Sequence, residues 1–299
     1  MAQNKQLNKF GGNWTAIKLE VLKKYLSAYA TILRKTGYKF AYIDAFAGTG
    51  YIKNKSKKQQ KKSQLINYDN EAKEYIKGSV KIALESEPKF DKYIFIELDE
   101  KKVFELSKMI ENEHPELLKN IKIENDDANK VIQKLCSRNW SKHRAVLFLD
   151  PFGMEVEWST IKAIAKTQAI DLWILFPLGI SVNRMLMKRR DEIPQEWSDS
   201  LDKIFGTHDW FNLFYTKQRQ ETLFGVQEEI KKTANFDKIA TYYIKRLKEV
   251  FAGVIENPMY LYNSTNNPIF LFCFASGNKR GSKVAIKIAR EIIEKELRE

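Results

Sequence analysis

Hydrophobic residues along the chain follow two alternating patterns. Between residues 15 and 35 they recur every three or four positions, which predicts an amphipathic helix that ends at Gly37. Short, nearly continuous apolar runs then follow at 40–44, 93–97, 121–124, 145–150 and 170–176. Helical patterns separate most of these runs. Strands that are apolar throughout and alternate with helices indicate a parallel sheet covered on both faces.

The end of the chain adds two further runs, 258–262 and 269–274, and a closing helical pattern on Ala285, Ile288 and Ile292. The two runs are separated by turn-forming residues, so we expect a hairpin. Seven strands with a late hairpin predict an α/β fold: a Rossmann-like, mostly parallel seven-stranded sheet with an antiparallel edge hairpin and a helical insertion.

The chain divides into four expected parts. Residues 1–38 form an N-terminal helical segment, and residues 39–182 form the core of the sheet with a basic insertion at 51–77. Residues 183–250 are polar with a helical pattern and hold ten aromatic residues, which we expect to form a small core of their own. Residues 251–299 supply the last strands and helix.

Charge and composition exclude several classes of protein. The 299 residues include 51 Lys and Arg against 38 Asp and Glu, a formal net charge of +13. No apolar run approaches the length of a membrane span, and the polar N-terminus lacks the apolar stretch of a signal peptide. Cys136, Cys273 and three scattered histidines show no metal-ligand spacing, so no metal site is predicted. We therefore expect a basic cytoplasmic protein that acts away from membranes.

Much of the excess charge lies in the run from residue 53 to residue 62. Six lysines and no acid stand there, namely Lys53, Lys55, Lys57, Lys58, Lys61 and Lys62. A second basic cluster follows at 188–190. Such runs form either solvated loops or phosphate-binding patches, and both interpretations stay open at this point.

Polar or glycine residues follow four of the predicted strands, at the edge where open α/β sheets bind ligands. Asp44 is followed by Gly48 and Gly50, and glycines let the backbone approach a ligand closely. Glu97 ends the second strand, where a carboxylate can accept hydrogen bonds from ribose hydroxyls, although Glu97 or Asp99 could instead favour the start of the next helix.

The remaining two ends are equally polar. Asp126 and Asp127 follow the third strand, and either can cap a helix or accept a proton from an adenine amino group. The fourth strand ends in Asp150-Pro-Phe-Gly153, which is either a plain turn or a grip for a substrate amino group beside a stacking ring. Each end alone is ambiguous, but four at one edge indicate a binding site.

These residues belong to longer phrases that extend over nearly the whole chain. The phrases are Trp14-Thr15 with Lys18, YIDAFAGTG (42–50), FIELDE (95–100), LFLDPFGMEVEWSTIKAIA (147–165), LWILFPLGISVNRM (172–185), FGTHDW (205–210) and FASGN (274–278). Together they resemble class I S-adenosylmethionine-dependent methyltransferases, and more closely the three-Cys-motif partner protein family. The resemblance implies a Rossmann-like methyltransferase domain and a partner that carries a three-cysteine cluster like that of radical-type S-adenosylmethionine enzymes.

The resemblance also implies roles for single residues. Cofactor-binding residues would be Asp44, Phe46, Gly48, Gly50, Glu97, Asp127 and Ala128, with the methionine portion on the glycine turn, the ribose on Glu97 and the adenine on Asp127. Asp150, Pro151 and Phe152 take the place of the D/N-P-P-Y/F motif that holds an extruded base in amino-methyltransferases. This sequence departs from the motif, because Phe152 replaces its second proline and Gly153 its aromatic residue.

The resulting hypothesis is methyl transfer from S-adenosylmethionine to a nitrogen of RNA or DNA, with Asp150 aligning the amine and the 53–62 lysines contacting phosphates. Two alternatives belong to other classes. One is an adaptor subunit that keeps the fold and serves the three-cysteine partner, which the altered motif favours. The other is a small-molecule methyltransferase with a lid formed by 183–250, which leaves the lysines without a role.

Overall fold

The computed structural model describes residues 14–50, 78–222 and 225–298. Its main sheet has the strand order β3-β2-β1-β4-β5-β10-β8, with β9 also paired to β10. The strands are β1 Lys39–Asp44, β2 Lys92–Ile96, β3 Ile121–Glu124, β4 His143–Leu149, β5 Ile170–Phe176, β8 Gly253–Val254, β9 Met259–Tyr262 and β10 Pro268–Ser276. The first five are parallel to one another, and β10 is antiparallel to β5, β8 and β9.

The short strands β8 and β9 pair with different parts of the same β10 edge. Gly253 and Val254 pair with the end of β10, whereas Met259 to Tyr262 pair with its first half. The two pieces therefore occupy a single position in the sheet, which gives seven positions in all. The predicted Rossmann-like fold with an antiparallel edge hairpin is confirmed.

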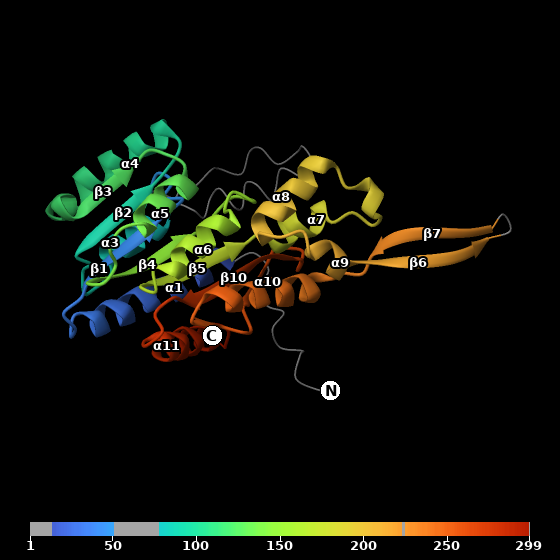
Figure 1. The fold of residues 1–299 in the computed structure, drawn as a ribbon. Helices are drawn as coiled ribbons and strands as arrows, with labels where there is room; N and C mark the ends of the chain where they lie inside the picture. Colours follow the sequence, from blue (N-terminus) through green and yellow to red (C-terminus); the bar gives the residue numbers. More distant parts are fainter. Residues whose placement is uncertain (1–13, 51–77, 223–224, 299) are drawn as a thin grey trace.

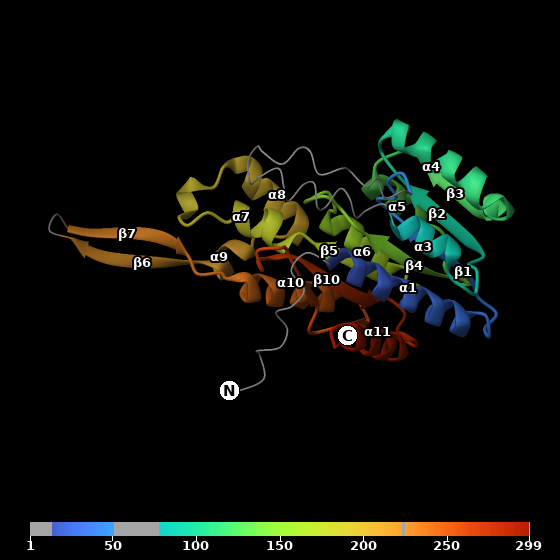
Figure 2. The ribbon, with the colours of Figure 1, turned by 180° about the vertical axis from the view of Figure 1, so that it is seen from behind.

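Helices cover both faces of this sheet, as Figures 1 and 2 show from opposite sides. The longer helices are α1 Trp14–Leu33, α3 Ser79–Glu85, α4 Glu100–Glu113, α5 Ala128–Cys136, α6 Trp158–Lys166, α8 Gln195–Phe205, α10 Phe236–Val250 and α11 Ser282–Glu296. Shorter helical segments are the 3-10 turns Pro115–Asn120 and Arg190–Glu192, the π-helix Leu178–Val182, α7 Asn183–Met185 and α9 Trp210–Phe214.

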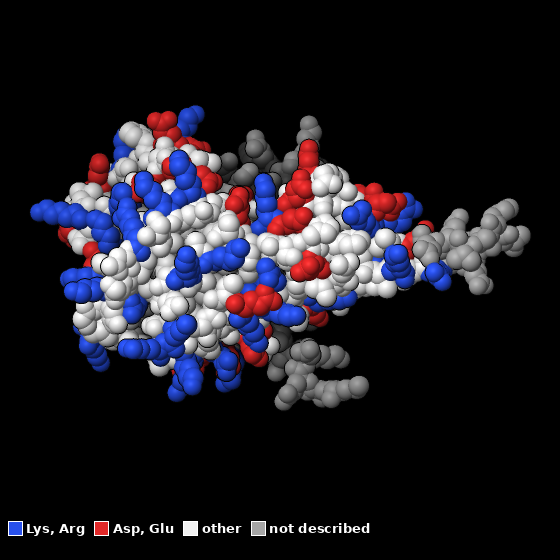
Figure 3. Space-filling view, viewed as in Figure 1, with Lys and Arg blue, Asp and Glu red and all other residues white. Residues whose placement is uncertain are grey.

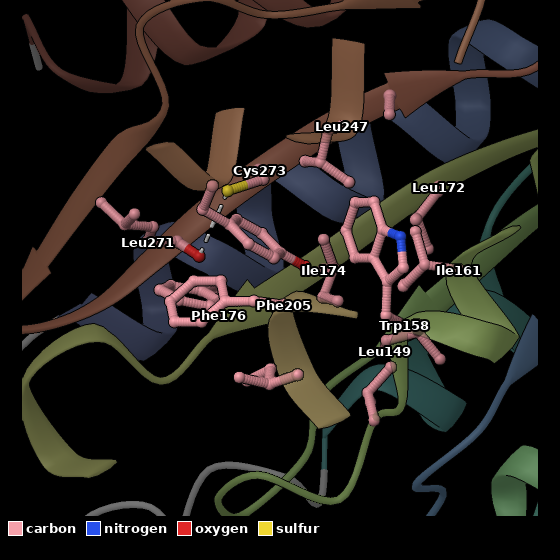
Figure 4. Close-up of a cluster of buried hydrophobic side chains, with 14 of the residues drawn as sticks. Leu149, Trp158, Ile161, Leu172, Ile174, Phe176, Phe205, Leu247, Leu271 and Cys273 are labelled. Carbon is pink, nitrogen blue, oxygen red and sulfur yellow. Dashed lines mark hydrogen bonds between the residues drawn. The ribbon is translucent and has the colours of Figure 1, made fainter. Parts of the chain in front are cut away.

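The strand β4 shows why two separate cores form. Its side chains alternate, so Ala145, Leu147 and Leu149 face one side of the sheet while Val146 and Phe148 face the other. The first core packs against α5, α6, α8 and α10, and the second against α1, α3, α4 and α11. Figure 4 shows part of the first core. Both faces of the sheet are thus buried, as nearly continuous apolar strands require.

The region 183–250 was expected to be helical, and this prediction needs a correction. Helices α7 to α10 account for much of it, but β6 Tyr215–Thr222 and β7 Gly225–Lys232 form an antiparallel hairpin. The hairpin projects from the body of the protein (Figure 1), and its side chains from Thr216 to Arg219 are all exposed. A strand without a buried face lacks the alternation of apolar and polar residues by which a strand is predicted.

The aromatic residues of this region also differ from expectation. Trp210 and Phe214 are buried, but they belong to the same cluster as Phe176 of β5 rather than to a separate core. Phe205 links them, with ring centroids 6.0 Å from Phe176 and 5.9 Å from Phe214. The inserted helices therefore extend the core of the sheet.

Candidate functional site

The glycine turn after β1 has the conformation that its sequence predicts. Gly48 and Gly50 have φ values of 63° and 77°, in the left-handed region that favours glycine. The turn crosses to the neighbouring strand, because the Ala47 amide donates to the Ile96 carbonyl at 3.0 Å. Phe46 is half-buried and packs on the core. The turn thus lies buried at the carboxyl edge of the sheet.

Asp44 lies at the base of this turn and is 0% exposed. The Tyr42 hydroxyl donates to its Oδ2 at 3.1 Å and the Phe46 amide to its Oδ1 at 3.2 Å, and Ser79 of α3 adds a side-chain hydrogen bond. Burial nevertheless raises its pKa to about 6, and the nearby Asp150 carboxylate adds to the rise. Among the residues that the structure describes, Asp44 is therefore a buried acid without a cationic partner of its own.

Asp150 has a different partner, the ammonium group of Lys18 on α1. Lys18 Nζ lies 2.5 Å from Asp150 Oδ2, and Lys18 is 0% exposed while Asp150 is 3% exposed. The ammonium also lies 5.3 Å from the centre of the Trp14 ring and 5.8 Å from that of Phe148, distances typical of cation–π contact. Asp44, Asp150 and Lys18 together leave this buried cluster with one excess negative charge.

Glu97 joins three strand ends through its backbone and side chain. Its Oε2 accepts the Gly48 amide at 2.9 Å, and its Oε1 accepts the Asp99 amide at 3.0 Å and lies 3.5 Å from Lys102 Nζ. Asn125, after β3, donates to the Glu97 carbonyl at 2.9 Å. Glu97 therefore belongs to the site.

Asp99 and Asp127 serve their helices. The Asp99 carboxylate accepts the first amides of α4, from Lys101 at 2.9 Å and Lys102 at 3.3 Å. Asp127 accepts the Lys130 amide at 3.0 Å and so caps α5, which is the capping alternative of the sequence analysis. Its side chain is exposed, and the next residue, Ala128, is half-buried against the core. A contact between Asp127 and adenine stays a prediction.

The Asp150-Pro-Phe-Gly153 turn places the Phe152 ring at the carboxyl edge of the sheet. Pro151 is buried, whereas Phe152 is half-buried, and Lys102 Nζ lies 5.4 Å from the centre of its ring. Since Lys102 also contacts Glu97, the turn after β4 lies beside the end of β2. The structure thus places Asp44, the glycine turn, Glu97, Phe152 and Asp150 at one edge of the sheet, and their role in binding stays a prediction.

Three contributors were not assigned a role from the sequence: Lys18, Ser79 and Leu98. Lys18 could have been found, because it is a charged residue within the apolar stripe of α1 that includes Trp14 and Leu22. Leu98 follows Glu97 and is 70% exposed, so an apolar side chain stands in solvent at the edge of the site. Ser79 carries no signal in the sequence.

The remaining predictions concern the lysine run, metal sites, membrane helices and the two cysteines. The six lysines between 53 and 62 fall outside the described residues. Within the described ranges no cluster of His, Cys, Asp and Glu could hold a metal ion, and no helix is long and apolar enough to cross a membrane. The thiols are shielded, since burial raises the pKa of Cys136 to about 12 and that of Cys273 further still.

Comparisons with known proteins find similarity in the fold and not in the sequence. No known family model and no curated protein matches the sequence. Among solved structures, the chain is similar to protein LPL1258 of Legionella pneumophila, of family DUF519, with a TM-score of 0.48 and 13% identity over 96% of this chain and 94% of that one.

Two further structures are similar at lower scores. A candidate S-adenosylmethionine-dependent methyltransferase of Listeria monocytogenes has a TM-score of 0.37 and 11% identity, over 84% of this chain and 97% of that one. The glycopeptide N-methyltransferase MtfA, solved with S-adenosyl-L-homocysteine, has a TM-score of 0.34 and 8% identity, over 85% and 89%. Likeness at this level describes the fold alone.

Proposed function

We propose that this protein is an S-adenosylmethionine-dependent methyltransferase that acts on an amino or ring nitrogen of nucleic acid, together with a partner bearing a three-cysteine motif. One observation carries the proposal: buried carboxylates end three neighbouring parallel strands, β2, β1 and β4, around a turn in which Gly48 and Gly50 adopt positive φ values. This is the edge at which open α/β sheets bind nucleotides.

The charges of the site fit the cofactor. The methionine portion of S-adenosylmethionine carries a sulfonium and an ammonium group, and the cluster of Asp44, Asp150 and Lys18 has one excess negative charge. The pKa of Asp44, raised to about 6 by burial, indicates a carboxylate that a bound cation would stabilise. Asp44 and the backbone at Gly48 and Gly50 would therefore hold the methionine portion.

The adenosine end fits Glu97 and its neighbours. A carboxylate can accept about four hydrogen bonds, and three donors of the protein occupy Glu97, which leaves room for a ribose hydroxyl. These donors also fix the orientation of the carboxylate. The exposed Leu98 and the half-buried Ala128 offer apolar surface for a purine ring, and Asp127 an acceptor for its amino group.

The chain's own residues then orient the acceptor nitrogen. When bound, S-adenosylmethionine supplies a methyl group that its sulfonium already activates, so the protein mainly needs to align the acceptor and exclude water. Lys18 holds Asp150 through Oδ2, and Oδ1 would accept a hydrogen bond from a substrate N–H. Phe152 offers the face of a half-buried ring to a planar base.

Nucleic acid is the proposed substrate because of charge and motif. The net charge of +13 and the lysine run at 53–62 favour a polyanion, and phosphate contacts gain from counterion release. The order Asp-Pro-aromatic resembles the base-holding motif of amino-methyltransferases. The three-cysteine partner rests on the family resemblance.

A second candidate function is a partner subunit with the methyltransferase fold. Two observations favour it: Gly153 stands where the base-holding motif has its aromatic residue, and Lys18 already occupies one oxygen of Asp150. Such a subunit would bind the cofactor without transferring its methyl group.

The first test is calorimetric titration with S-adenosylmethionine, using Glu97→Ala and the control Glu111→Ala. Losing hydrogen bonds from Glu97 to the ribose should cost roughly 2–4 kcal/mol, a fall in affinity of roughly 30-fold to 1,000-fold. Glu111 is an exposed acid on α4, the helix that follows Glu97, so its variant should bind like the wild type. Absence of binding by the wild type would contradict the proposal.

The second test separates the two candidate functions. The protein is incubated with methyl-labelled S-adenosylmethionine and total RNA or DNA, with and without the three-cysteine partner. Label transferred to nucleic acid, alone or with the partner, supports the enzyme, and its loss in Asp150→Asn would assign Asp150. Cofactor binding without any transfer in either mixture supports the subunit instead.

A further inference from the structure

The two edges of the main sheet carry opposite charge. At the carboxyl edge, the segments that follow β1, β2, β3 and β4 contain eight acids and no Lys or Arg, over 44–50, 97–99, 125–127 and 150–157. At the amino edge, where the parallel strands begin, four segments contain ten Lys and Arg and no acid. These amino-edge segments are 34–39, 137–144, 166–169 and 277–283.

The amino-edge segments lie side by side. They border β1, β4, β5 and β10, which are consecutive in the sheet. The Lys39 amide donates to the Lys142 carbonyl at 3.1 Å, which joins the first two segments. The Gly277 amide donates to the Ile170 carbonyl at 2.9 Å, which joins the last two. Since neighbouring strands lie about 4.8 Å apart, the four segments form a row about 14 Å wide.

Most of these cations have no partner in the protein. Arg34 lies 3.6 Å from Asp91, and the Arg144 guanidinium lies 3.7 Å from the centre of the Tyr38 ring. The other eight are exposed and, within the described part of the chain, make no ion pair and no side-chain hydrogen bond. This amino-edge row consists of Lys35, Lys39, Arg138, Lys142, Lys166, Lys279, Arg280 and Lys283.

A hollow opens at the β5 and β10 end of the row. Its volume is about 290 Å³, and its lining includes Lys162, Lys166, Gln168, Gly277 and Lys279 but no acid. Lys162 and Lys166 stand four residues apart on α6, so they share one face of the helix. Three ammonium groups and an amide supply donors for the oxygens of a phosphate group.

The acids that border the row do not offset its charge. Glu87 pairs with Lys89 at 3.0 Å, and Glu249, at the end of α10, pairs with Arg246. Asp171 lies beneath the row and is buried. In Figure 3, Lys and Arg side chains gather over the part of this face where Figure 1 shows β1, β4 and α11. The row therefore concentrates like charges whose repulsion a polyanion would relieve.

The composition of the row favours one class of polyanion. No aliphatic or aromatic side chain of the amino-edge segments is exposed, and Tyr38 and Trp140 are half-buried. Protein interfaces are centred on apolar and aromatic side chains, and proteins that lie on membranes insert apolar ones. A sugar–phosphate backbone needs only cations and donors, and it releases condensed counterions when it binds them. Nucleic acid is therefore the occupant that this surface fits.

We infer that the amino-edge row is a second contact surface for the backbone of nucleic acid, at the opposite edge of the sheet from Asp150. The inference rests on the nucleic-acid part of the proposed function and specifies the size of the substrate. The seven residues of β4 separate the two edges by about 23 Å. A substrate that touches both edges must extend further than this, so it is a long or folded nucleic acid. Phosphate contacts at the row would position it without reading its sequence.

The test uses the full chain with three lysines of the row replaced, Lys142→Gln, Lys166→Gln and Lys279→Gln, which we call the edge variant. The matched control removes three exposed lysines from α1, α8 and α10, namely Lys23→Gln, Lys203→Gln and Lys238→Gln. Both variants lose the same charge, so a difference between them reports where the charge lies. Thermal melting and titration with S-adenosylmethionine show that the fold and the cofactor site are intact in each.

Fluorescence anisotropy measures binding to labelled hairpins with stems of about 20 bp, roughly 68 Å long, made of RNA and of DNA, and to single strands. In the edge variant, three lost phosphate contacts should weaken binding by about fivefold each at about 0.15 M salt, roughly 100-fold together. The slope of log affinity against log salt should shrink by about two to three. The control should keep the wild-type slope, and an edge variant that binds like the control would overturn the inference.

Two further probes test other polyanions. Poly-glutamate stands for an acidic protein, and vesicles that contain phosphatidylserine stand for an anionic membrane. Neither should bind as tightly as the hairpins at equal salt. If the edge variant loses binding to one of these probes but keeps its affinity for the hairpins, the row belongs to that other partner and the inference is overturned.

Methyl transfer separates this inference from the proposed function. Wild-type protein that binds S-adenosylmethionine but neither RNA nor DNA contradicts both. Weaker hairpin binding by the edge variant, without methylation by any form of the protein, supports the row and contradicts the enzyme. Where nucleic acid is methylated, the edge variant should raise KM for it by roughly 100-fold and leave kcat unchanged, because the row contributes binding alone. A lowered kcat with unchanged KM would contradict the row.

Discussion

Two buried aspartates at opposite edges of the sheet meet the same helix in different ways. Asp150, after β4, pairs with Lys18 at the carboxyl edge, whereas Asp171, near the start of β5, accepts the Tyr25 hydroxyl at 2.8 Å at the amino edge. Ser276 of β10 adds a second hydroxyl to Asp171 at 2.5 Å. Lys18 and Tyr25 lie seven residues apart, on one face of α1.

The difference shows that burial and a raised pKa do not by themselves mark a functional site. Burial raises the pKa of Asp171 to about 6, as it does for Asp44. Asp171, however, has a neutral donor on each carboxylate oxygen and lies between a helix and two strands, so its role is to fix them. Asp44 lies under a glycine turn and near a second carboxylate, Asp150, whose charge a bound cation would offset.

The largest expected effect is that of Lys18→Met on stability. The change leaves Asp150 buried without its cation, which should lower the free energy of unfolding by about 3–5 kcal/mol in urea denaturation. Adding Asp150→Leu should restore most of this loss, because an apolar pair avoids the desolvation of both charges. A loss below about 1 kcal/mol in the single variant would show that the pair contributes little.

Tyr25→Phe tests the other edge and should have a smaller effect. Asp171 would keep only the Ser276 donor, which should lower the free energy of unfolding by about 1.5–3 kcal/mol near pH 8, where the carboxylate is ionised. The loss should shrink toward pH 5, where Asp171 is protonated in the folded protein. Cofactor affinity should not change, and a change would mean that the two edges are coupled through α1.

How far the sequence predicts this molecule depends on what each residue packs against. The strands and α1 could be predicted because their apolar residues are periodic or continuous, and the four polar strand ends because parallel strands end together. Asp171 could not be recognised, because it stands within an otherwise apolar run and its partners come from α1 and β10. Lys18 stands out in the sequence as a charge within the apolar stripe of α1, but only the fold brings it to Asp150.

The β6–β7 ribbon could not be predicted for a different reason. Apart from Tyr215, Val226 and Ile230, its strand residues are polar or glycine, so their order lacks the alternation that would distinguish a strand from an exposed helix. Only the contacts of Tyr215 and Lys232 with the segment 183–188 define where it begins. A segment whose structure is set at its root, rather than along its length, cannot be derived from periodicity.

The most discriminating effect is the pH dependence of the two acids that share a raised pKa. Each carboxyl binds its proton more tightly in the folded state than in the unfolded state, so each should reduce stability as pH rises from about 4 to about 6. Asp44→Asn and Asp171→Asn should each flatten that decline, by about 1.4 kcal/mol per pH unit, in urea titrations of the free protein.

Only Asp44, however, should affect the cofactor. A cationic ligand favours its ionised form, so S-adenosylmethionine should bind about tenfold more weakly at pH 5 than at pH 7 in the wild type and in Asp171→Asn. Asp44→Asn should bind more weakly at pH 7 and lose this dependence. If calorimetry gives Asp44→Asn the wild-type profile, the cation does not lie beside Asp44, and the contrast between the two edges rests on Asp150 and Lys18.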